Sequence, residues 1–440
     1  MRLAAHPLPT ALRKPAANPR LWHLDPRVVF LNHGSFGACP KPVLAFQRRL
    51  QEQIEREPVK FFVDDLEQLW DGSRRALARF LGAKADDLVF VPNATAGVNT
   101  VLRSLRFRPG DELLVTDYEY NACRNALVHA AQLWRAKPVV VRMPFPLKSP
   151  AQMLEAVMDR VTCRTRLALL DHVTSQTAVV MPIAKLIREL EARGVDTLVD
   201  GAHTPGMIEL NVQALGAAYY TGNCHKWLCA PKGAAFLHVR RDKQKDLRPL
   251  IISHGANSRR TDRSRFLLEF GWMGTVDPSA VLSVGEALRF MSSLLPGGWS
   301  QIRARNHALA LAAQDVICRT LDIAPPCPND MLGSMAAFPV PDLSAAEMRR
   351  LAREPDPLRQ RLRREYNIEV PTTPWPAPPK RLLRISAQLY NSLPQYVRLA
   401  ETLTRLLVNR TARSERAVGN RSPQRLDTPR HAPSTPSLAI

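Results

Sequence analysis

The sequence is poor in aromatic residues and in cysteines that could pair. Aromatic side chains make up 6% of the 440 residues, and they do not interleave with the basic runs as a stacking platform for single-stranded nucleic acid requires. The seven cysteines are odd in number and form no Cys-x-x-Cys pair, which favours free thiols in a reducing compartment over a disulfide scaffold. We therefore expect a cytoplasmic protein that does not have nucleic acid as a partner.

Long apolar runs are also missing. No stretch of about 18 apolar residues is free of charge, so no membrane span is predicted. The N-terminal residues lack the apolar segment of a secretory signal. Their prolines and arginines favour a flexible arm over residues 1–27.

Acidic residues are in deficit, since 40 of them face 61 lysines and arginines and leave a net charge of +21. The basic residues concentrate at 259–265, 349–364 and 410–430. We interpret most of this charge as solvated surface, and residues 411–440, which have almost no apolar periodicity, as a disordered basic tail. A basic, non-catalytic binding protein is the alternative from another class of function.

The sequence does contain enough apolar residues, 45%, for a sizeable core. Through the middle of the chain, short apolar runs alternate with helical stretches, which is typical of βαβ units around a mostly parallel sheet. The predicted strands are Leu88–Val91, Glu112–Thr116, Pro138–Arg142, Leu167–His172, Thr197–Asp200, Ala217–Thr221 and Ala234–Val239. The predicted helices between them include Asn121–Ala136, Ala151–Val161 and Ile183–Ala192.

The pattern changes after about residue 280. Two long helical segments lead into a smaller set of strands and helices, which predicts a large domain over residues 28–290 and a smaller α/β domain over residues 291–410. The elements predicted there are helices Ser279–Leu295 and Trp299–Thr320, strand Met335–Val340, helix Asp356–Tyr366, strand Arg381–Ser386 and helix Pro394–Val408.

The main chemical signal is an acid followed by a lysine. Asp200, in Val-Asp-Gly-Ala-His, ends a predicted strand, where ligands bind in open α/β sheets. Lys226, in Gly-Asn-Cys-His-Lys-Trp, lies beyond the next strand and can return to the same crevice. Pyridoxal phosphate (PLP) chemistry needs such a pair, a lysine amine that bonds the cofactor aldehyde and a carboxylate that keeps the pyridine nitrogen protonated. Alternatively, Asp200 caps a helix and Lys226 is an ordinary surface lysine.

With these motifs, the chain from about Phe30 to Asn391 resembles the class V aminotransferase family of fold-type I PLP enzymes. The segments at residues 116–122, 171–175 and 272–280 are most similar to the isopenicillin N epimerase-like members. The resemblance implies an α/β fold, with a large domain around a mostly parallel mixed sheet and a smaller C-terminal α/β domain. It also implies PLP as the cofactor and no metal.

The resemblance implies a cofactor site made by several segments. Lys226 is the catalytic residue that it implies. The implied cofactor-binding residues are Ala94, Thr95, Tyr118, Ser175, Asp200, His203, Asn223, His225 and Thr275. Asn93 to Thr95 resemble the phosphate loop at a helix N-terminus. Tyr118 stands where relatives usually stack a histidine on the ring, and Ser175 where desulfurases often carry asparagine.

The resemblance also implies a role for Thr275 at a subunit interface and two residues at the substrate. Thr275 resembles a residue that touches the phosphate of a partner subunit, which makes a homodimer the expected active unit. Arg384 resembles the arginine that holds the substrate α-carboxylate. His33, in Leu-Asn-His-Gly-Ser-Phe-Gly, is a candidate substrate contact on a loop that closes over the site.

The reaction is less determined than the cofactor. All members use the freed lysine amine as a general base near the α-carbon of an amino-acid substrate. A desulfurase also needs a thiol on the loop before Arg384, and residues 369–380 contain no cysteine. The local motifs favour an epimerase, with Tyr118, His33 or Tyr390 as the second proton donor. A C–S lyase acting on a cysteine conjugate or sulfoxide, and a class V aminotransferase, are the alternatives.

Overall fold

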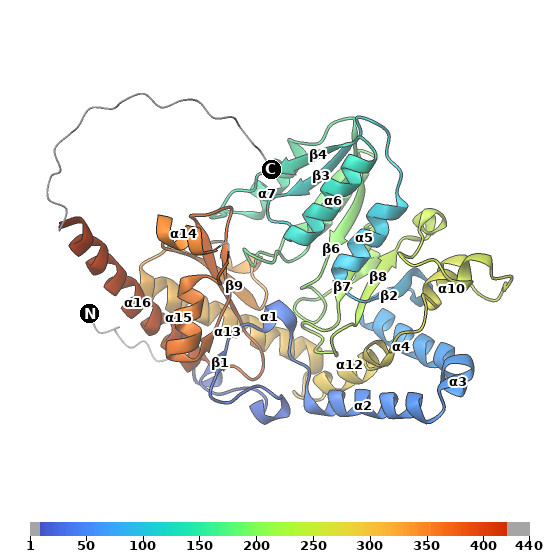
Figure 1. Cartoon of the computed structure of the whole chain (residues 1–440), viewed down its shortest axis with the longest axis horizontal. Coiled ribbons are helices and arrows are strands. Elements are labelled where there is room, and N and C mark those ends of the chain that lie inside the picture. The colour runs from blue at the N-terminus through green and yellow to red at the C-terminus, as the bar shows by residue number, and fades with distance from the viewer. Residues whose placement is uncertain (1–8, 352, 420–440) are drawn as a thin grey trace.

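The computed structural model of the chain describes residues 9–351 and 353–419. A larger part built around a seven-stranded sheet lies beside a smaller part built around a three-stranded sheet (Figure 1). Within these described ranges, no helix is long and apolar enough to cross a membrane.

The large sheet carries the chemistry. Its strands are β2 (Leu88–Val91), β3 (Glu112–Thr116), β4 (Lys137–Val141), β5 (Thr165–Asp171), β6 (Asp196–Asp200), β7 (Tyr219–Asn223) and β8 (Ala235–Val239). Their order is β2-β8-β7-β6-β5-β3-β4. Strand β8 runs antiparallel to both neighbours and the others pair in parallel. All seven predicted strands are therefore present, each within two residues of its expected bounds.

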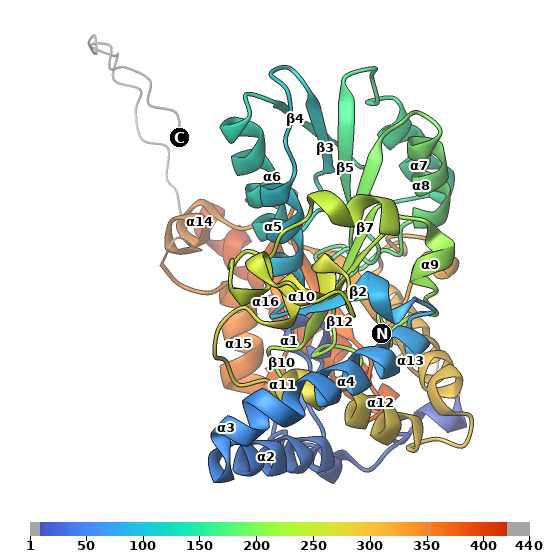
Figure 2. The ribbon, with the colours of Figure 1, turned by 90° about the vertical axis from the view of Figure 1, so that its right-hand side faces the viewer.

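Helices cover both faces of this sheet (Figure 2). Helices α5 (Ala94–Ser104) and α6 (Asn121–Leu133) lie on one face, and α7 (Pro150–Met158), α8 (Ile183–Glu191) and α9 (Val212–Leu215) lie on the other. Because both faces are covered, strands β2, β3, β7 and β8 are buried along their whole length. This burial explains why the strands read as short, nearly continuous apolar runs in the sequence.

The remaining helices of the large part precede or follow the seven strands in the chain. Before it lie α1 (His33–Phe36), α2 (Lys41–Arg56), α3 (Pro58–Lys60) and α4 (Leu66–Phe80), and after it α10 (Arg265–Gly271), α11 (Ser279–Leu282) and α12 (Val284–Ser292). The helix expected over 279–295 is thus divided in two at Ser283. The domain boundary predicted near residue 290 falls in α12, which packs on α2 and α4 and also on α13 (Gly298–Leu321).

The smaller part contains an antiparallel sheet in the order β11-β12-β9, made of β9 (Met335–Val340), β11 (Thr372–Pro374) and β12 (Arg381–Ser386). Its helices are α14 (Ala345–Leu351), α15 (Pro357–Tyr366) and α16 (Leu393–Gly419), which packs on α13. Near the N-terminus, β1 (Val29–Phe30) pairs in parallel with β10 (Ile368–Glu369).

The structure corrects the predictions for both ends of the chain. Residues 9–27 are not a free arm, because Trp22 is buried with its ring 5.1 Å from that of Tyr390. The amides of Ala16 and Ala17 also donate to the carbonyl of Leu389. At the other end, helix α16 continues to residue 419, so the prediction of disorder is wrong for 411–419. The remaining parts of the two predictions, residues 1–8 and 420–440, lie outside the described residues.

Candidate active site

A cavity of about 360 Å³ opens at the carboxyl ends of β5, β6 and β7, beside the first turn of α5. We call it the Lys226 cavity. It is lined by Ser35, Phe36, Pro92, Asn93, Ala94, Thr95, Tyr120, Asp171, Val173, Ser175, Asp200, Ala202, His203, Asn223, His225, Lys226 and Gly233. The cavity brings together Lys226 and seven of the residues that the sequence analysis assigned to the cofactor.

The Lys226 side chain is partly buried, and its amine lies 3.1 Å from Nε2 of His203. Burial lowers the pKa of Lys226 to about 8, and the charge of Arg384 adds to this effect. On the other side of the His203 ring, Nδ1 accepts a hydrogen bond from the Trp227 indole at 3.4 Å. A lysine with a lowered pKa carries a useful fraction of neutral amine near neutral pH, which is the form that acts as a nucleophile or base.

Asp200 ends strand β6 inside the same cavity. Its Oδ1 accepts a hydrogen bond from the Ala202 amide at 2.9 Å, and its Oδ2 accepts one from the Cys123 thiol at 3.2 Å. Burial raises the pKa of Asp200. Within the described residues no cation forms an ion pair with this carboxyl, so a cationic group on a ligand would favour its ionised form.

The first turn of α5 offers backbone donors to the cavity. The helix begins after Asn93, whose Oδ1 accepts from the Ala96 amide at 2.8 Å. Asn223 accepts from the Ala94 amide at 2.9 Å. In the described part of the chain, the amide and hydroxyl of Thr95 donate to no protein group. Free donors at the positive end of a helix are suited to a phosphate.

His225 lies at the same end of the cavity, with Nδ1 3.2 Å from the carbonyl of Ala234. Burial lowers the pKa of His225 to about 4, so the ring is neutral at physiological pH. Because a carbonyl only accepts, Nδ1 of the neutral ring carries the hydrogen, and Nε2 is left as an acceptor that adds no second charge beside Lys226.

Arg384 is a buried cation that forms no ion pair with an acid in the described part of the chain. It is 7% exposed, and its guanidinium donates to the carbonyl of Ser175 at 2.5 Å and to the hydroxyl of Ser35 at 3.0 Å. Its Nε has no hydrogen-bond partner, and burial lowers the pKa of Arg384 to about 10. Arg384 does not line the cavity itself, but both of its serine contacts do. A buried cation of this kind is stabilised by an added carboxylate.

The loop from His33 to Gly37 closes one side of the cavity. Gly37 adopts φ +68°, and a Cβ at this position would lie 2.0 Å from the carbonyl oxygen of His225. Only glycine allows this close approach to the lysine segment. Ser35 and Phe36 of the same loop line the cavity, although the sequence analysis selected His33.

His33, predicted as a substrate contact, is not among the residues that line the Lys226 cavity. Its ring is fully buried, with Nδ1 2.8 Å from the Tyr390 hydroxyl and Nε2 3.0 Å from the carbonyl of Lys226. Both ring nitrogens are occupied, and neither His33 nor Tyr390 lines the cavity. His33 therefore supports the backbone at Lys226.

Tyr118, predicted as the ring-stacking residue, also lies outside the lining of the Lys226 cavity. Its ring is buried against Trp375 and Phe145, and its hydroxyl donates to the carbonyl of Pro144 at 2.7 Å. Tyr120, two residues further on, lines the Lys226 cavity and is 45% exposed. The segment contains both tyrosines after one strand, and the sequence alone does not indicate which of them turns toward the cavity.

Thr275 lies in the exposed segment between α10 and α11 and does not line the cavity of its own chain. The predicted contact with phosphate would require a second subunit. Two acids that the sequence analysis did not select, Asp171 and Glu119, lie beside Asp200. Asp171 ends a predicted strand as Asp200 does, so its position was a signal for it.

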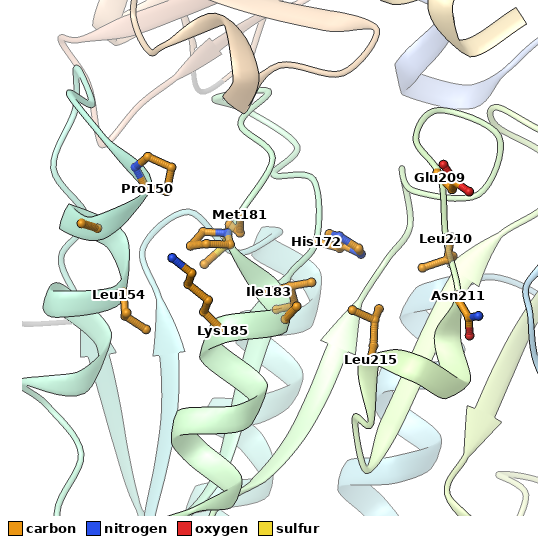
Figure 3. A pocket seen from close by; sticks show the side chains of 13 residues that line it. Pro150, Leu154, His172, Met181, Ile183, Lys185, Glu209, Leu210, Asn211 and Leu215 are labelled. Carbon is orange, nitrogen blue, oxygen red and sulfur yellow. The ribbon is translucent and has the colours of Figure 1, made fainter. Parts of the chain in front are cut away.

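A second cavity of about 460 Å³ lies on the opposite side of β5, between α7, the start of α8 and residues 209–215 (Figure 3). His172 lines it with Leu154, Met181 and Ile183. We call it the apolar cavity. Side chains alternate along a strand, so His172 faces this cavity while the preceding Asp171 faces the Lys226 cavity. The apolar cavity contains no member of the Lys226, Asp200 and Arg384 set.

Fold and site together define a PLP-dependent enzyme of fold type I. The chain belongs to the class V aminotransferase family, whose model (Aminotransferase class-V) matches residues 45–355. It is 34% identical over 398 residues to isopenicillin N epimerase of Amycolatopsis lactamdurans, with 87% of this chain and 96% of the relative covered. It is 31% identical over 411 residues to a probable chloroplastic L-cysteine desulfhydrase of Arabidopsis thaliana, with 88% and 84% covered.

Solved structures confirm the fold. The cystine C–S lyase C-DES, in complex with cysteine persulfide, superposes with a TM-score of 0.71 at 20% identity, over 86% of this chain and 97% of that one. The cysteine desulfurase CsdA from Escherichia coli gives a TM-score of 0.70 at 21% identity, over 89% and 99%. The predicted family, fold class and cofactor are thereby confirmed. The lowered pKa of Lys226, the buried Asp200 and the free donors of α5 fit PLP chemically.

Proposed function

We propose that this enzyme removes the α-proton of an amino acid with the Lys226 amine and then eliminates a sulfur group from the β-carbon. The observation that carries the proposal is the position of Lys226, a partly buried lysine with a pKa lowered to about 8. It lies near Arg384, which forms no ion pair with an acid of the described residues. When bound, PLP supplies an electron sink conjugated to the α-carbon. Arg384 would hold the substrate α-carboxylate.

The cofactor would be held by residues from both faces of the cavity. Ala94, Thr95, Asn223 and His225 surround the place suited to its phosphate. Asp200 would hold the proton on the pyridine nitrogen. Ser175 and His203 would lie beside the ring oxygen, and Tyr120, in place of Tyr118, would offer the aromatic face. These assignments are tested by loss of PLP affinity in the corresponding variants.

Elimination needs a single base at the α-carbon. Lys226 takes the α-proton, the electron pair left at the α-carbon forms a double bond to the β-carbon, and the C–S bond breaks with its pair going to sulfur. The lysine ammonium returns the proton to the leaving sulfur, and water hydrolyses the released enamine to a keto acid and ammonia. None of the three residues proposed as a second proton donor lines the cavity, which weakens the prediction of an epimerase. The names of the desulfhydrase relatives agree with C–S cleavage.

Epimerisation is the second candidate. It needs a proton donor on the face opposite Lys226, and the phenol of Tyr120 is an acid that lines the cavity. The two epimerase relatives, at 34% and 33% identity, also favour it.

One experiment separates the candidates. Purified enzyme is incubated with PLP in D₂O and with L-cysteine, L-cystine, cysteine conjugates and sulfoxides, and other L-amino acids, beside Lys226→Ala. Release of pyruvate and ammonia with the matching sulfur fragment (sulfide from L-cysteine, persulfide from L-cystine, thiol from a conjugate or sulfenic acid from a sulfoxide) supports the lyase. Recovery of α-deuterated substrate as a mixture of L and D forms, without pyruvate, would replace it with the epimerase. Amino-group transfer to an added keto acid would identify an aminotransferase.

We also propose that the active unit is a homodimer located in the cytoplasm. Val276 beside Thr275 and Phe36 at the cavity mouth are exposed large apolar side chains, as expected for surfaces that a second subunit covers. Light scattering gives the mass, and mixed dimers of Lys226→Ala and Thr275→Ala chains would regain one competent site if the threonine acts across the interface.

A further inference from the structure

Three carboxyl groups gather at the edge of the sheet that forms the floor of the Lys226 cavity. Asp171 and Asp200 are paired in register at the carboxyl ends of β5 and β6. Glu119 follows β3, the neighbour of β5 on the other side. All three side chains are at most 3% exposed, and Asp171 lines the cavity directly.

This group of acids has too few hydrogen-bond donors if every member is ionised. Oε1 of Glu119 accepts from the Tyr120 amide at 3.2 Å, but Oε2 of Glu119 and Oδ2 of Asp171 have no partner. Beyond burial, the neighbouring charge of Asp171 also raises the pKa of the Glu119 carboxyl. A single proton between them would turn one carboxyl into a donor to the other, which removes the deficit.

The charges around Glu119 and Asp171 also favour a single proton between the two carboxyls. Within the described residues neither Glu119 nor Asp171 forms an ion pair, and the cation that interacts with Asp171 and Asp200 is Lys226. The Cys123 thiol, which faces the same acids, stays protonated because burial and the neighbouring carboxylates raise its pKa. Burial and Asp200 also raise the pKa values of Glu119 and Asp171. Neighbouring carboxyl groups in a buried site repel one another when all are ionised, so they share protons.

We infer that Glu119 and Asp171 share one proton at neutral pH and together act as a positioning pair for Asp200. With two charges on the pair, repulsion would favour a proton on Asp200 itself. With one charge, Asp200 can stay ionised, which is the form that holds a proton on the cofactor's ring nitrogen. The remaining charge of the pair also stabilises positive charge on the cofactor. The inference depends on the PLP site and on neither candidate reaction.

Infrared difference spectroscopy on the full-length protein tests the shared proton. A protonated carboxyl has a carbonyl-stretch band that is separate from carboxylate bands, and the buried pair should contribute one such band at pH 7.5. The band should persist in Asp200→Asn, which removes any contribution from Asp200, and should disappear in the triple variant Glu119→Gln/Asp171→Asn/Asp200→Asn. Absence of the band from the wild type and from Asp200→Asn, or its persistence in the triple variant, would overturn the inference.

A second readout tests the effect on the cofactor. With PLP bound, Glu119→Gln/Asp171→Asn should shift the pH midpoint of the visible absorbance band to lower pH by about one unit, a tenfold change in proton affinity, because one negative charge is lost. Glu209→Gln, an exposed acid at the apolar cavity, is the matched control and should leave the midpoint unchanged. An unshifted midpoint in the double variant would remove the positioning role, even if the infrared band is present. Neither readout requires turnover, so a wrong assignment of the reaction would leave both intact.

Discussion

Strand β5 ends between two cavities of similar size and different chemistry. Asp171 faces the Lys226 cavity of about 360 Å³, and His172, the next residue, faces the apolar cavity of about 460 Å³. Each cavity contains a lysine, Lys226 in one and Lys185 in the other. The Lys226 cavity lies among charged side chains with unsatisfied hydrogen-bonding groups. The apolar cavity is larger, but its lining is mainly apolar. Volume alone therefore does not identify a site, and the arrangement of charged groups does.

The two lysines give the largest expected contrast. Lys226→Ala should lower kcat by more than about 1000-fold, because the base and the covalent attachment of PLP are both lost. The visible band of the bound cofactor should disappear or change. Lys185→Ala should change kcat less than about twofold. Comparable losses in the two variants would contradict the assignment of chemistry to one cavity.

Arg384→Lys should lower kcat/KM by about 10- to 100-fold, mainly through KM, because a lysine cannot form the two parallel hydrogen bonds of a guanidinium with a carboxylate. Amino acids whose carboxylate is replaced by an amide should bind wild type and variant almost equally. Equal losses for both kinds of substrate would mean that Arg384 only maintains the structure around Ser35 and Ser175.

The lowered pKa of Lys226 predicts how PLP attaches to the PLP-free protein. Only the neutral amine attacks an aldehyde, and burial lowers the pKa of this lysine to about 8. The attachment rate should therefore rise about tenfold per pH unit below 8 and level off above it. Stopped-flow absorbance measures the rate, and a rise that continues to pH 10 would indicate a lysine with an ordinary pKa.

His172 should give the smallest effect. Its Nδ1 lies 2.8 Å from the hydroxyl of Tyr220, so His172→Phe should lower the free energy of unfolding by about 1 kcal/mol through the lost hydrogen bond. The cofactor spectrum should stay unchanged, because the ring faces the apolar cavity. A double-mutant cycle with Tyr220→Phe measures the coupling by urea denaturation. A large change in the spectrum would show that the two cavities are not independent.

The sequence allowed the main sheet and the central acid–lysine pair to be predicted, since both depend on local signals. Parallel strands covered on both faces give short apolar runs, and Asp200 follows such a run directly. Ala94, Thr95, Ser175, His203, Asn223 and His225 came from the resemblance, and the structure brings them to the same cavity.

The differences between the expected and the observed placements have a common physical cause. Whether Tyr118 or Tyr120 turns toward the cavity depends on Trp375, more than 250 positions away, which provides the packing surface for Tyr118. His33 is occupied by Tyr390, and the N-terminal segment is held by Leu389. Partners this distant in sequence leave no periodic or local pattern near the residues that they fix.

The pairing of β1 with β10 has a consequence for how the protein is made. Strand β1 leaves the ribosome early, but its partner at residues 368–369 is synthesised more than 330 residues later. Tyr390, which hydrogen-bonds the His33 ring at the carbonyl of Lys226, is likewise synthesised long after His33. Closing so long a loop is entropically costly and slow. The lysine segment is thus translated well before its support exists, and the cofactor site can be completed only when nearly the whole chain has been released.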